Sequence, residues 1–229
     1  EFSSLMARFY EKGALILGGC CGTSPEYIAS LKKVLNTTEI KERAEIIKGV
    51  ISGATSSVIL SEPRVIGERI NPTGKKRFKQ ALRDNDIDYI LKEGLAQLDN
   101  GAHILDVNVG LPEIDEKAML PNVVSQLQTV LNLPLQIDTS DPVAMERAMR
   151  CYNGKPMVNS VNGKQESMHS VFPLIKKYGG VVVGLTLDEN GIPDNVEGRI
   201  RIFEKILKEA IKYGIDKKDI VVDPLAMTI

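Results

Sequence analysis

The pattern that decides the fold is clearest in the stretch LQIDTSDP at residues 135–142, which a helix-like run at 143–150 follows. A short apolar run ends at the polar residue Asp138, and a helix start comes next. Asp141 has the side chain of an N-cap, and Pro142 suits the first helical position. Since Asp141 already fits the N-cap, Asp138 is not needed to cap this helix. The stretch therefore predicts a strand, a polar strand end and a helix in immediate succession.

The same succession recurs on both sides of this stretch, throughout residues 63–229. The predicted strands are 65–67, 103–107, 135–137, 157–160, 181–185 and 220–222. The predicted helices are 87–98, 123–131, 143–150, 171–178 and 199–213, and Gly179-Gly180 marks the end of the fourth. Strands that alternate with helices predict parallel βαβ units, and hence an α/β fold.

Polar residues recur where the predicted strands end. They are Glu68, Asn71, Asp106, Asn108, Asp138, Asn159, Asn162 and Asp223. In an α/β barrel the carboxyl ends of all strands point to one face, so these side chains would line one shallow cup. A doubly wound sheet would gather only those near its switch point. The alternative for each residue other than Asp138 is to cap the helix that follows its strand.

The first 62 residues are organised differently. We expect a helix at 2–10, a strand at 14–17 and a helix at 25–35, and a single βα unit is too small to be a domain. Residues 36–62 are polar and weakly patterned, with a charged helical piece at 39–48, and they are interpreted as a linker.

Two adjacent cysteines, Cys20 and Cys21, stand between the strand predicted at 14–17 and the helix predicted at 25–35. A helix N-terminus lowers the pKa of nearby thiols, and two thiolates suit a soft cation such as zinc. The alternatives are two small buried side chains or a disulfide between neighbours. No third ligand is evident nearby, because Cys151, His103 and His169 are distant in sequence.

Composition narrows the classes of partner. Lysine and arginine total 29 against 30 acidic residues, so charge gives no case for nucleic acid or an anionic membrane. Hydrophobic residues make up 43%, enough for an ordinary core. Three cysteines, no evident secretory leader and no apolar stretch of about 18 residues lead us to expect a cytoplasmic protein that acts on small molecules.

The word GGCCGTSP at residues 18–25 resembles the last strand and helix of the homocysteine-binding barrel of methionine synthases and betaine-homocysteine methyltransferases. The resemblance implies that Cys20 and Cys21 are zinc ligands, with a third cysteine supplied by an earlier strand. Residues 1–35 would then be the C-terminal end of such a barrel, with its zinc site incomplete.

Five further motifs occur in order: GERINPTG at 67–74, LDVNVG at 105–110, QIDTS at 136–140, VNSVNG at 158–163 and VDPL at 222–225. Together they resemble the pterin-binding barrel of cobalamin-dependent methionine synthases, of methyltetrahydrofolate:corrinoid methyltransferases and, more distantly, of dihydropteroate synthases. The resemblance implies a (β/α)8 TIM-barrel type of fold over residues 63–229, truncated after about six strands.

The resemblance also implies a site for 5-methyltetrahydrofolate. Asp138, Asn159 and Asp223 match the pterin-holding positions, while Glu68 and Asn71 match polar residues of the first strand. Asp106 and Asn108 either line the cup or order neighbouring loops. A pterin edge carries N–H donors beside a carbonyl, which carboxylates and a side-chain amide can pair with. Asp223 and Asn159 are also expected to position the reacting pterin, and Arg69 and Lys75 are candidates for contact with the glutamate tail.

The reaction implied is transfer of the N5 methyl group to cob(I)alamin carried by another module, fused or separate, for methylation of homocysteine to methionine. No cysteine or histidine in this part is an obvious acid for N5, and the family uses polar side chains and water there, including an asparagine from a later strand. A homocysteine-barrel end followed by a pterin barrel favours a methionine synthase over a stand-alone corrinoid methyltransferase. The remaining alternative is a fragment without activity of its own, since six strands cannot close an eight-stranded barrel.

Overall fold

The computed structural model describes residues 1–39 and 48–226, and it divides into two compact units, Glu1–Ile47 and Lys48–Ile229. In the first unit α1 (Phe2–Glu11) packs on α2 (Pro25–Leu35). The ring of Phe2 meets that of Tyr27 edge to face, and the Ser3 hydroxyl donates to that of Ser30 at 2.8 Å. Two amphipathic helices therefore make up the ordered core of this unit.

The strand predicted at residues 14–17 is wrong. Leu15 and Ile16 are 75% and 95% exposed, and they belong to neither of the two sheets in the described part of the chain. A β-strand exists only through hydrogen bonds to a neighbouring strand, and none lies beside this segment within the described residues. Apolar composition alone was therefore insufficient to form a strand here.

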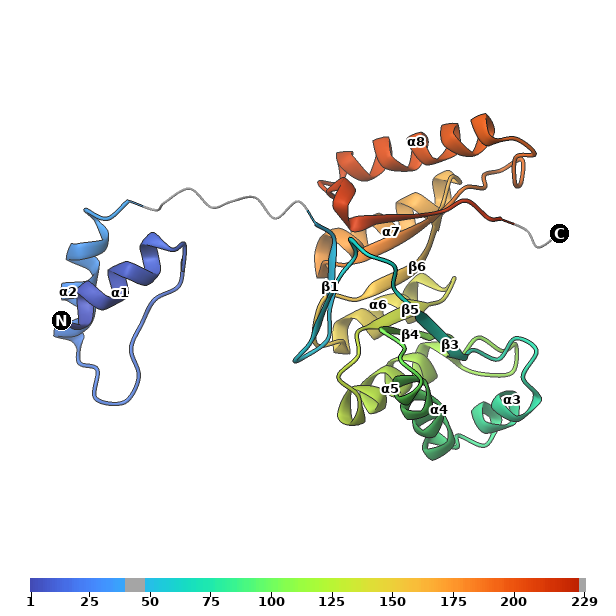
Figure 1. The fold of residues 1–229 in the computed structure, drawn as a ribbon, viewed down its shortest axis with the longest axis horizontal. Helices are drawn as coiled ribbons and strands as arrows, with labels where there is room; N and C mark the ends of the chain where they lie inside the picture. Colours follow the sequence, from blue (N-terminus) through green and yellow to red (C-terminus); the bar gives the residue numbers. More distant parts are fainter. Residues whose placement is uncertain (40–47, 227–229) are drawn as a thin grey trace. The chain divides into compact units, whose positions relative to one another are not determined.

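The second unit begins with an antiparallel hairpin and continues as alternating strands and helices (Figure 1). The strands are β1 (Val50–Ser52), β2 (Ser57–Ile59), β3 (Ile66–Ile70), β4 (Ile104–Val107), β5 (Leu135–Asp138), β6 (Met157–Asn162), β7 (Val181–Leu185) and β8 (Ile220–Asp223). The helices are α3 (Lys76–Arg83), α4 (Ile87–Asp99), α5 (Glu116–Val130), α6 (Pro142–Cys151), α7 (Gln165–Tyr178) and α8 (Val196–Lys212), with a short 3-10 turn at Lys217–Asp219.

The six strands β3 to β8 form one parallel sheet in which each strand pairs with the next along the chain. This sequential order is that of an α/β barrel and differs from a doubly wound sheet, whose strand order reverses at a switch point. Within the described residues β3 and β8 remain the two edges, so the sheet is not closed. The prediction of a TIM-barrel type of fold with six strands is confirmed.

Two hydrophobic clusters cover the two faces of this sheet. The larger one joins alternate strand residues such as Leu105, Ile137 and Val182 to the helices α3 to α8. The smaller one consists of Ile51, Ile104, Met157 and Val181, with partly buried neighbours that include Val58 and Leu60. Because side chains alternate along a strand, one face packs on helices while the other is available to the hairpin and the site.

The hairpin of β1 and β2 closes the amino end of the inner face. Ile51 is fully buried there, next to the first residues of β4, β6 and β7. The Tyr152 hydroxyl donates to the Ser52 carbonyl at 2.8 Å and accepts from the Leu135 amide at 3.0 Å. Gly154, at φ 149°, passes so close to the Ser52 carbonyl that a Cβ would clash.

The hairpin lies in the segment 36–62, which was interpreted as a linker. Residues 40–47 of that segment lie outside the described part of the chain, and they include most of the helical piece predicted at 39–48.

The helices extend further than their apolar periodicity indicates. α5 begins at Glu116 and α7 at Gln165, several residues before the predicted starts, and they contain Pro121 and Pro173. Their first turns are mostly polar, so only the buried turns carry the hydrophobic signal. α3 was not predicted, because it has few apolar residues in a strongly basic run. No helix among the described residues is both long and apolar enough to cross a membrane.

Candidate functional site

The polar strand ends come together at the carboxyl edge of the sheet. The Asn108 side-chain amide donates to Asp138 Oδ2 at 2.9 Å, which joins the ends of β4 and β5. Below it, Gln136 Nε2 donates to Asp106 Oδ1 at 2.6 Å across the same two strands. Parallel pairing of Asp106 with Gln136 in the ladder sets this geometry. Two carboxylates and two amides thus form two hydrogen-bonded pairs on the neighbouring strands β4 and β5.

Asp106 is the most buried of these four residues, with 1% of its surface exposed. Burial raises the pKa of its carboxyl to about 7, with a further contribution from the charge of Asp138, while the amide of Gln136 opposes the rise. Its second oxygen, Oδ2, has no hydrogen-bond partner among the described residues. A carboxyl in this setting holds its proton up to near neutral pH.

Asp138 is less buried and better supported as an anion. Burial raises its pKa as well, followed by the charges of Glu68 and Glu116, but the hydrogen bond from Asn108 opposes the rise. The pKa of both carboxyls is thus raised, and Asp106 is the more deeply buried of the two. Asp141 caps α6, as predicted, by accepting from the amides of Val143 at 2.8 Å and Ala144 at 3.2 Å. Asp138 is consequently free to face a ligand.

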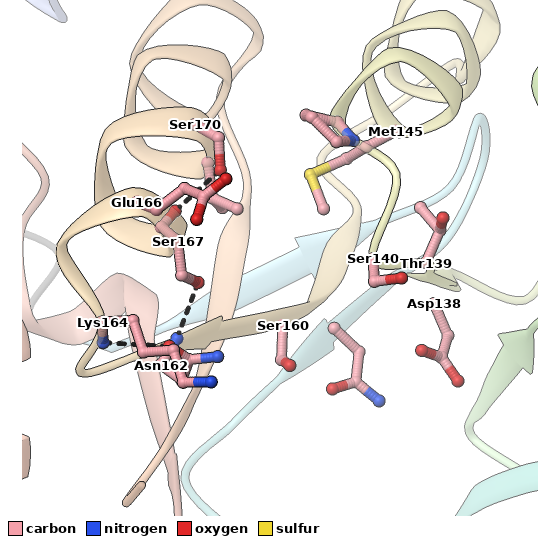
Figure 2. Close-up of a pocket in the computed structure, with 13 residues that line it drawn as sticks. Asp138, Thr139, Ser140, Met145, Ser160, Asn162, Lys164, Glu166, Ser167 and Ser170 are labelled. Atoms are coloured by element: carbon pink, nitrogen blue, oxygen red, sulfur yellow. Dashed lines mark hydrogen bonds between the residues drawn. The ribbon is translucent and has the colours of Figure 1, made fainter. Parts of the chain in front are cut away.

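A pocket of about 340 Å³ opens beside Asp138, between the ends of β5 and β6 and the first turns of α6 and α7 (Figure 2). Asp138 and Ser140 lie on one side, and Lys164, Glu166 and Ser167 lie on the other (Figure 2). Asn159 also lines it. The lining is rich in hydroxyl, amide and charged groups, which suits a ligand with several hydrogen-bonding edges.

Asn159 also lines a second pocket, of about 430 Å³, on the inner face of the sheet. Asp223 and Gln136 line that second pocket, together with apolar residues such as Met157 and Val183. The structure thus places Asn159 in both pockets, with Asp138 on one side of it and Asp223 on the other. A lining of polar and apolar side chains suits a flat, partly apolar ring with polar edges.

Several predicted site residues also order the loops that follow their strands. Asn71 Oδ1 accepts from the Thr73 amide at 2.9 Å, Asn108 Oδ1 from the Gly110 amide at 2.9 Å, and Asp223 Oδ1 from the Leu225 amide at 2.7 Å. Asn162 likewise holds the turn into α7 by accepting from the Lys164 amide at 2.9 Å. These bonds span two residues and are turn contacts, so none of the four caps a helix. Asn108 thus orders its loop, and its amide also contacts Asp138.

Glu68 and Asn71 lie together at the end of β3, where the Asn71 amide approaches Glu68 Oε1 at 3.5 Å. Lys75, which was considered for the glutamate tail, is already occupied: its ammonium group donates to the carbonyls of Glu68 at 3.0 Å and Asn71 at 3.2 Å. It holds the loop after β3 in place. Lys75 therefore supports the position of the two predicted residues.

Gln136 is the site residue that the sequence analysis missed. It holds the buried Asp106 and reaches the second pocket. The signal was present, because Gln136 stands two residues before Asp138 and so shares its face of β5. A polar residue in the middle of an otherwise apolar strand marks the inner face as a site.

The cysteine pair belongs to the first unit. Cys20 and Cys21 are exposed, their sulfur atoms lie 3.9 Å apart, and the Cys20 amide donates to Thr23 Oγ1 at 3.1 Å. Within residues 1–39 and 48–226 no group of three or more histidine, cysteine, aspartate or glutamate side chains could hold a metal ion. The two thiols are fewer than the four ligands of a tetrahedral zinc site, so the described residues do not make a complete one.

Comparisons with known proteins agree with the two-part organisation. Residues 67–228 match the family described as Pterin binding enzyme, and residues 1–35 match Homocysteine S-methyltransferase. The chain is similar over its whole length to the methionine synthases of Mycobacterium tuberculosis (28% identity) and Mycobacterium leprae (29% identity). It spans 20% of the length of each of these relatives.

Solved structures resemble the second unit in fold. A dihydropteroate synthase of Xanthomonas albilineans with 4-aminobenzoic acid aligns with a TM-score of 0.60 at 23% identity, over 77% of this chain and 64% of that one. That of Vibrio fischeri aligns with a TM-score of 0.57 at 18% identity, over 76% and 66%. The chain therefore belongs to the pterin binding enzyme family, and its two segments together correspond to part of a methionine synthase.

Proposed function

We propose that the second unit binds 5-methyltetrahydrofolate at the carboxyl edge of its sheet. The observation that carries the proposal is that Asp138, Asn159 and Asp223 line two pockets that share Asn159. These are the positions that match the pterin-holding residues of the family. Glu68, Asn71, Asp106 and Asn108 complete the cofactor-binding group from β3 and β4.

The protonation states favour a pterin. Asp138 in its ionised form would accept from the ring N–H and the exocyclic amine, two donors that lie side by side on the pterin edge. Asn159 both donates and accepts, so it can pair with a carbonyl and an N–H. A protonated Asp106 beneath Asp138 avoids two negative charges in one buried site.

The reaction proposed for this site is transfer of the N5 methyl group. Cobalamin carried by another module would supply the nucleophile for the methyl group, and homocysteine would be the final acceptor. The amine is a poor leaving group, so the site must hold N5 where a hydrogen bond can reach it as the methyl departs. We assign Asn159 and Asp223 to this positioning, in a preorganised arrangement of dipoles and charge.

We propose that Cys20 and Cys21 are ligands of a zinc ion in the homocysteine-binding part. The proposal is supported by the family match of residues 1–35 and by the 3.9 Å separation of the two sulfur atoms. Because the described residues supply two thiols alone, no step of the reaction is assigned to this metal here.

The proposal is tested by calorimetric titration of the 229-residue chain with 5-methyltetrahydrofolate, alongside Asp138→Ala and Asn159→Ala. Each variant is expected to weaken binding by about 10- to 100-fold, since it removes a hydrogen bond to a charged or polar ligand edge. Asp194→Ala, in the exposed loop before α8, serves as the control and is expected to bind like the parent chain. Binding that survives both site variants unchanged contradicts the proposal.

A second readout separates the proposed reaction from binding without activity. Methyl transfer from 5-methyltetrahydrofolate to free cob(I)alamin is followed by the absorbance of the corrinoid. Transfer by the parent chain supports a catalytic unit. Tight binding without transfer supports the alternative, a segment that has no independent activity.

A further inference from the structure

Four asparagine residues of the chain are followed directly by glycine: Asn100, Asn153, Asn162 and Asn190. In such a pair the glycine amide nitrogen can attack the asparagine side chain and close a succinimide ring, because glycine has no side chain that hinders the approach. The attacking nitrogen must first lose its proton. A pair is therefore reactive when both its side-chain amide and its glycine N–H are free, and folding protects it by engaging either group.

Hydrogen bonds engage three of the four pairs. Their glycine amides each donate to a backbone carbonyl: Gly101 to Leu98 at 2.9 Å, Gly163 to Leu187 at 2.8 Å and Gly191 to Asp188 at 3.0 Å. Two of the asparagine side chains are engaged as well, since Asn100 Nδ2 donates to the Ala96 carbonyl at 2.6 Å and Asn162 Oδ1 accepts from the Lys164 amide at 2.9 Å. An amide that donates to a carbonyl keeps its proton, so these three pairs are protected.

The pair Asn153-Gly154 differs from the other three. Both residues are exposed, and within residues 1–39 and 48–226 neither the Asn153 side chain nor the Gly154 N–H forms a hydrogen bond. The contact that Asn153 does make is through its backbone amide, which donates to Gln128 Oε1 at 2.6 Å. This pair therefore meets both conditions for ring closure.

The pair also lies where the hairpin of β1 and β2 is held to the rest of the unit. Directly after Gly154, Lys155 forms an antiparallel bridge with Ser52: the Lys155 amide donates to the Ser52 carbonyl at 3.1 Å, and the Ser52 amide donates to the Lys155 carbonyl at 2.9 Å. Gly154 itself passes against the same Ser52 carbonyl, with no room for a Cβ. A change in the length of the backbone between Asn153 and Gly154 would therefore disturb this bridge.

We propose that Asn153 is a deamidation site, at which the folded chain converts asparagine to aspartate and isoaspartate, and that isoaspartate there loosens the hairpin. The Gly154 nitrogen forms a bond to Cγ of Asn153, the Cγ–Nδ2 bond breaks, and ammonia leaves with the proton of the Gly154 amide. Water then opens the ring. Opening at Cγ gives aspartate, and opening at the backbone carbonyl gives isoaspartate, whose main chain is lengthened by the side-chain methylene.

The test follows all four pairs in the 229-residue chain during incubation at mildly alkaline pH, where the glycine amide loses its proton more often. Peptide mass spectrometry measures the conversion of each asparagine, and enzymatic methylation of isoaspartate identifies the lengthened product. We expect Asn153 to be converted first in the folded chain. In urea, where no backbone hydrogen bond protects a glycine amide, the four pairs should react at comparable rates.

A second measurement follows the consequence for the hairpin. As isoaspartate accumulates, the thermal midpoint of the second unit should decrease by about 2–4 °C, the shift expected when one backbone hydrogen bond is lost in a unit of this size. Asn153→Gln, whose longer side chain closes the larger ring much more slowly, should keep its midpoint over the same time. Asn190→Gln, the matched control in the exposed loop after β7, should change with time as the parent chain does. Circular dichroism confirms that each variant is folded at the start.

The inference is overturned if another of the four pairs is converted first in the folded chain, or if Asn153 is favoured to the same degree in urea, where the fold no longer selects. A midpoint that stays constant while isoaspartate forms at Asn153 overturns the link to the hairpin. An equal decrease in Asn153→Gln does the same, because the change would then arise elsewhere in the chain.

Discussion

Asp106 is the most buried carboxyl at the carboxyl edge of the sheet. Its pKa rises from 3.8 in an unperturbed carboxyl to about 7 in the folded chain, because it is buried beside Asp138. Between these values the unfolded chain has lost the proton and the native chain still holds it. Since the unfolded state then binds fewer protons, the free energy of unfolding decreases as pH rises through this window.

Asp106→Asn removes this dependence. Relative to the parent chain, the variant's free energy of unfolding should increase by on the order of 3 kcal/mol between about pH 4 and about pH 8. Urea unfolding at several pH values measures it. Asp194→Asn, in an exposed loop, is the matched control and should follow the parent at each pH. Parallel curves for Asp106→Asn and the parent chain would show that Asp106 titrates normally.

The hydrogen bond from Asn108 lowers the pKa of Asp138, against the rise that burial causes. Asn108→Ala removes the 2.9 Å hydrogen bond to the carboxylate, so the pKa of Asp138 should rise further. We expect folate affinity to decrease by about 10-fold, and the pH below which binding is lost to move upward. Titrations across pH measure both effects. Asn190→Ala, in the exposed loop after β7, should leave the pH profile of binding unchanged.

At the scale of elements, the hairpin of β1 and β2 is held to the sheet by Tyr152. Its hydroxyl links the Ser52 carbonyl to the Leu135 amide, and burial raises its pKa to about 12. Tyr152→Phe leaves the Leu135 amide without this partner, while the Ser52 carbonyl keeps its bond from the Lys155 amide at 3.1 Å, and should destabilise the second unit by about 1–3 kcal/mol. Tyr213→Phe, whose ring packs on Phe172, is the control and should change stability by less than about 0.5 kcal/mol. Equal effects would mean that the hydroxyl of Tyr152 does not anchor the hairpin.

The elements that the sequence predicted well are those with a repeated local signal. All six strands of the sheet were predicted, because each is an apolar run that ends at a polar residue and precedes a helix. α3 and the hairpin could not be predicted in this way. α3 is mostly basic, and each strand of the hairpin has three residues, so its stability comes from the buried Ile51 and from Tyr152, which is distant in sequence.

The predicted site residues were found from strand-end positions and from a family resemblance, and their grouping at one edge of the sheet follows from the parallel topology. The sequence could not predict which contacts each of these side chains makes. Whether Asn108 orders its loop or contacts Asp138 depends on the packing of β4 on β5, and it does both. The occupation of Lys75 by backbone carbonyls depends on the path of the loop after β3.

At the scale of the whole molecule, we expect the second unit to be independent of the first in stability. Both hydrophobic clusters of the second unit consist of residues between 51 and 221. A chain of residues 48–229 should therefore unfold with a midpoint within about 2 °C of the same transition in the 229-residue chain. Calorimetry of the two chains measures this. Loss of a cooperative transition on removing residues 1–47 would contradict the division into two units.

The central claim is that a pterin lies at the carboxyl edge of the sheet, and a crystal structure of the 229-residue chain with 5-methyltetrahydrofolate tests it most directly. The account predicts the pterin edge within hydrogen-bond distance of Asp138, Asn159 and Asp223. A pterin bound elsewhere, away from these three side chains, would contradict it.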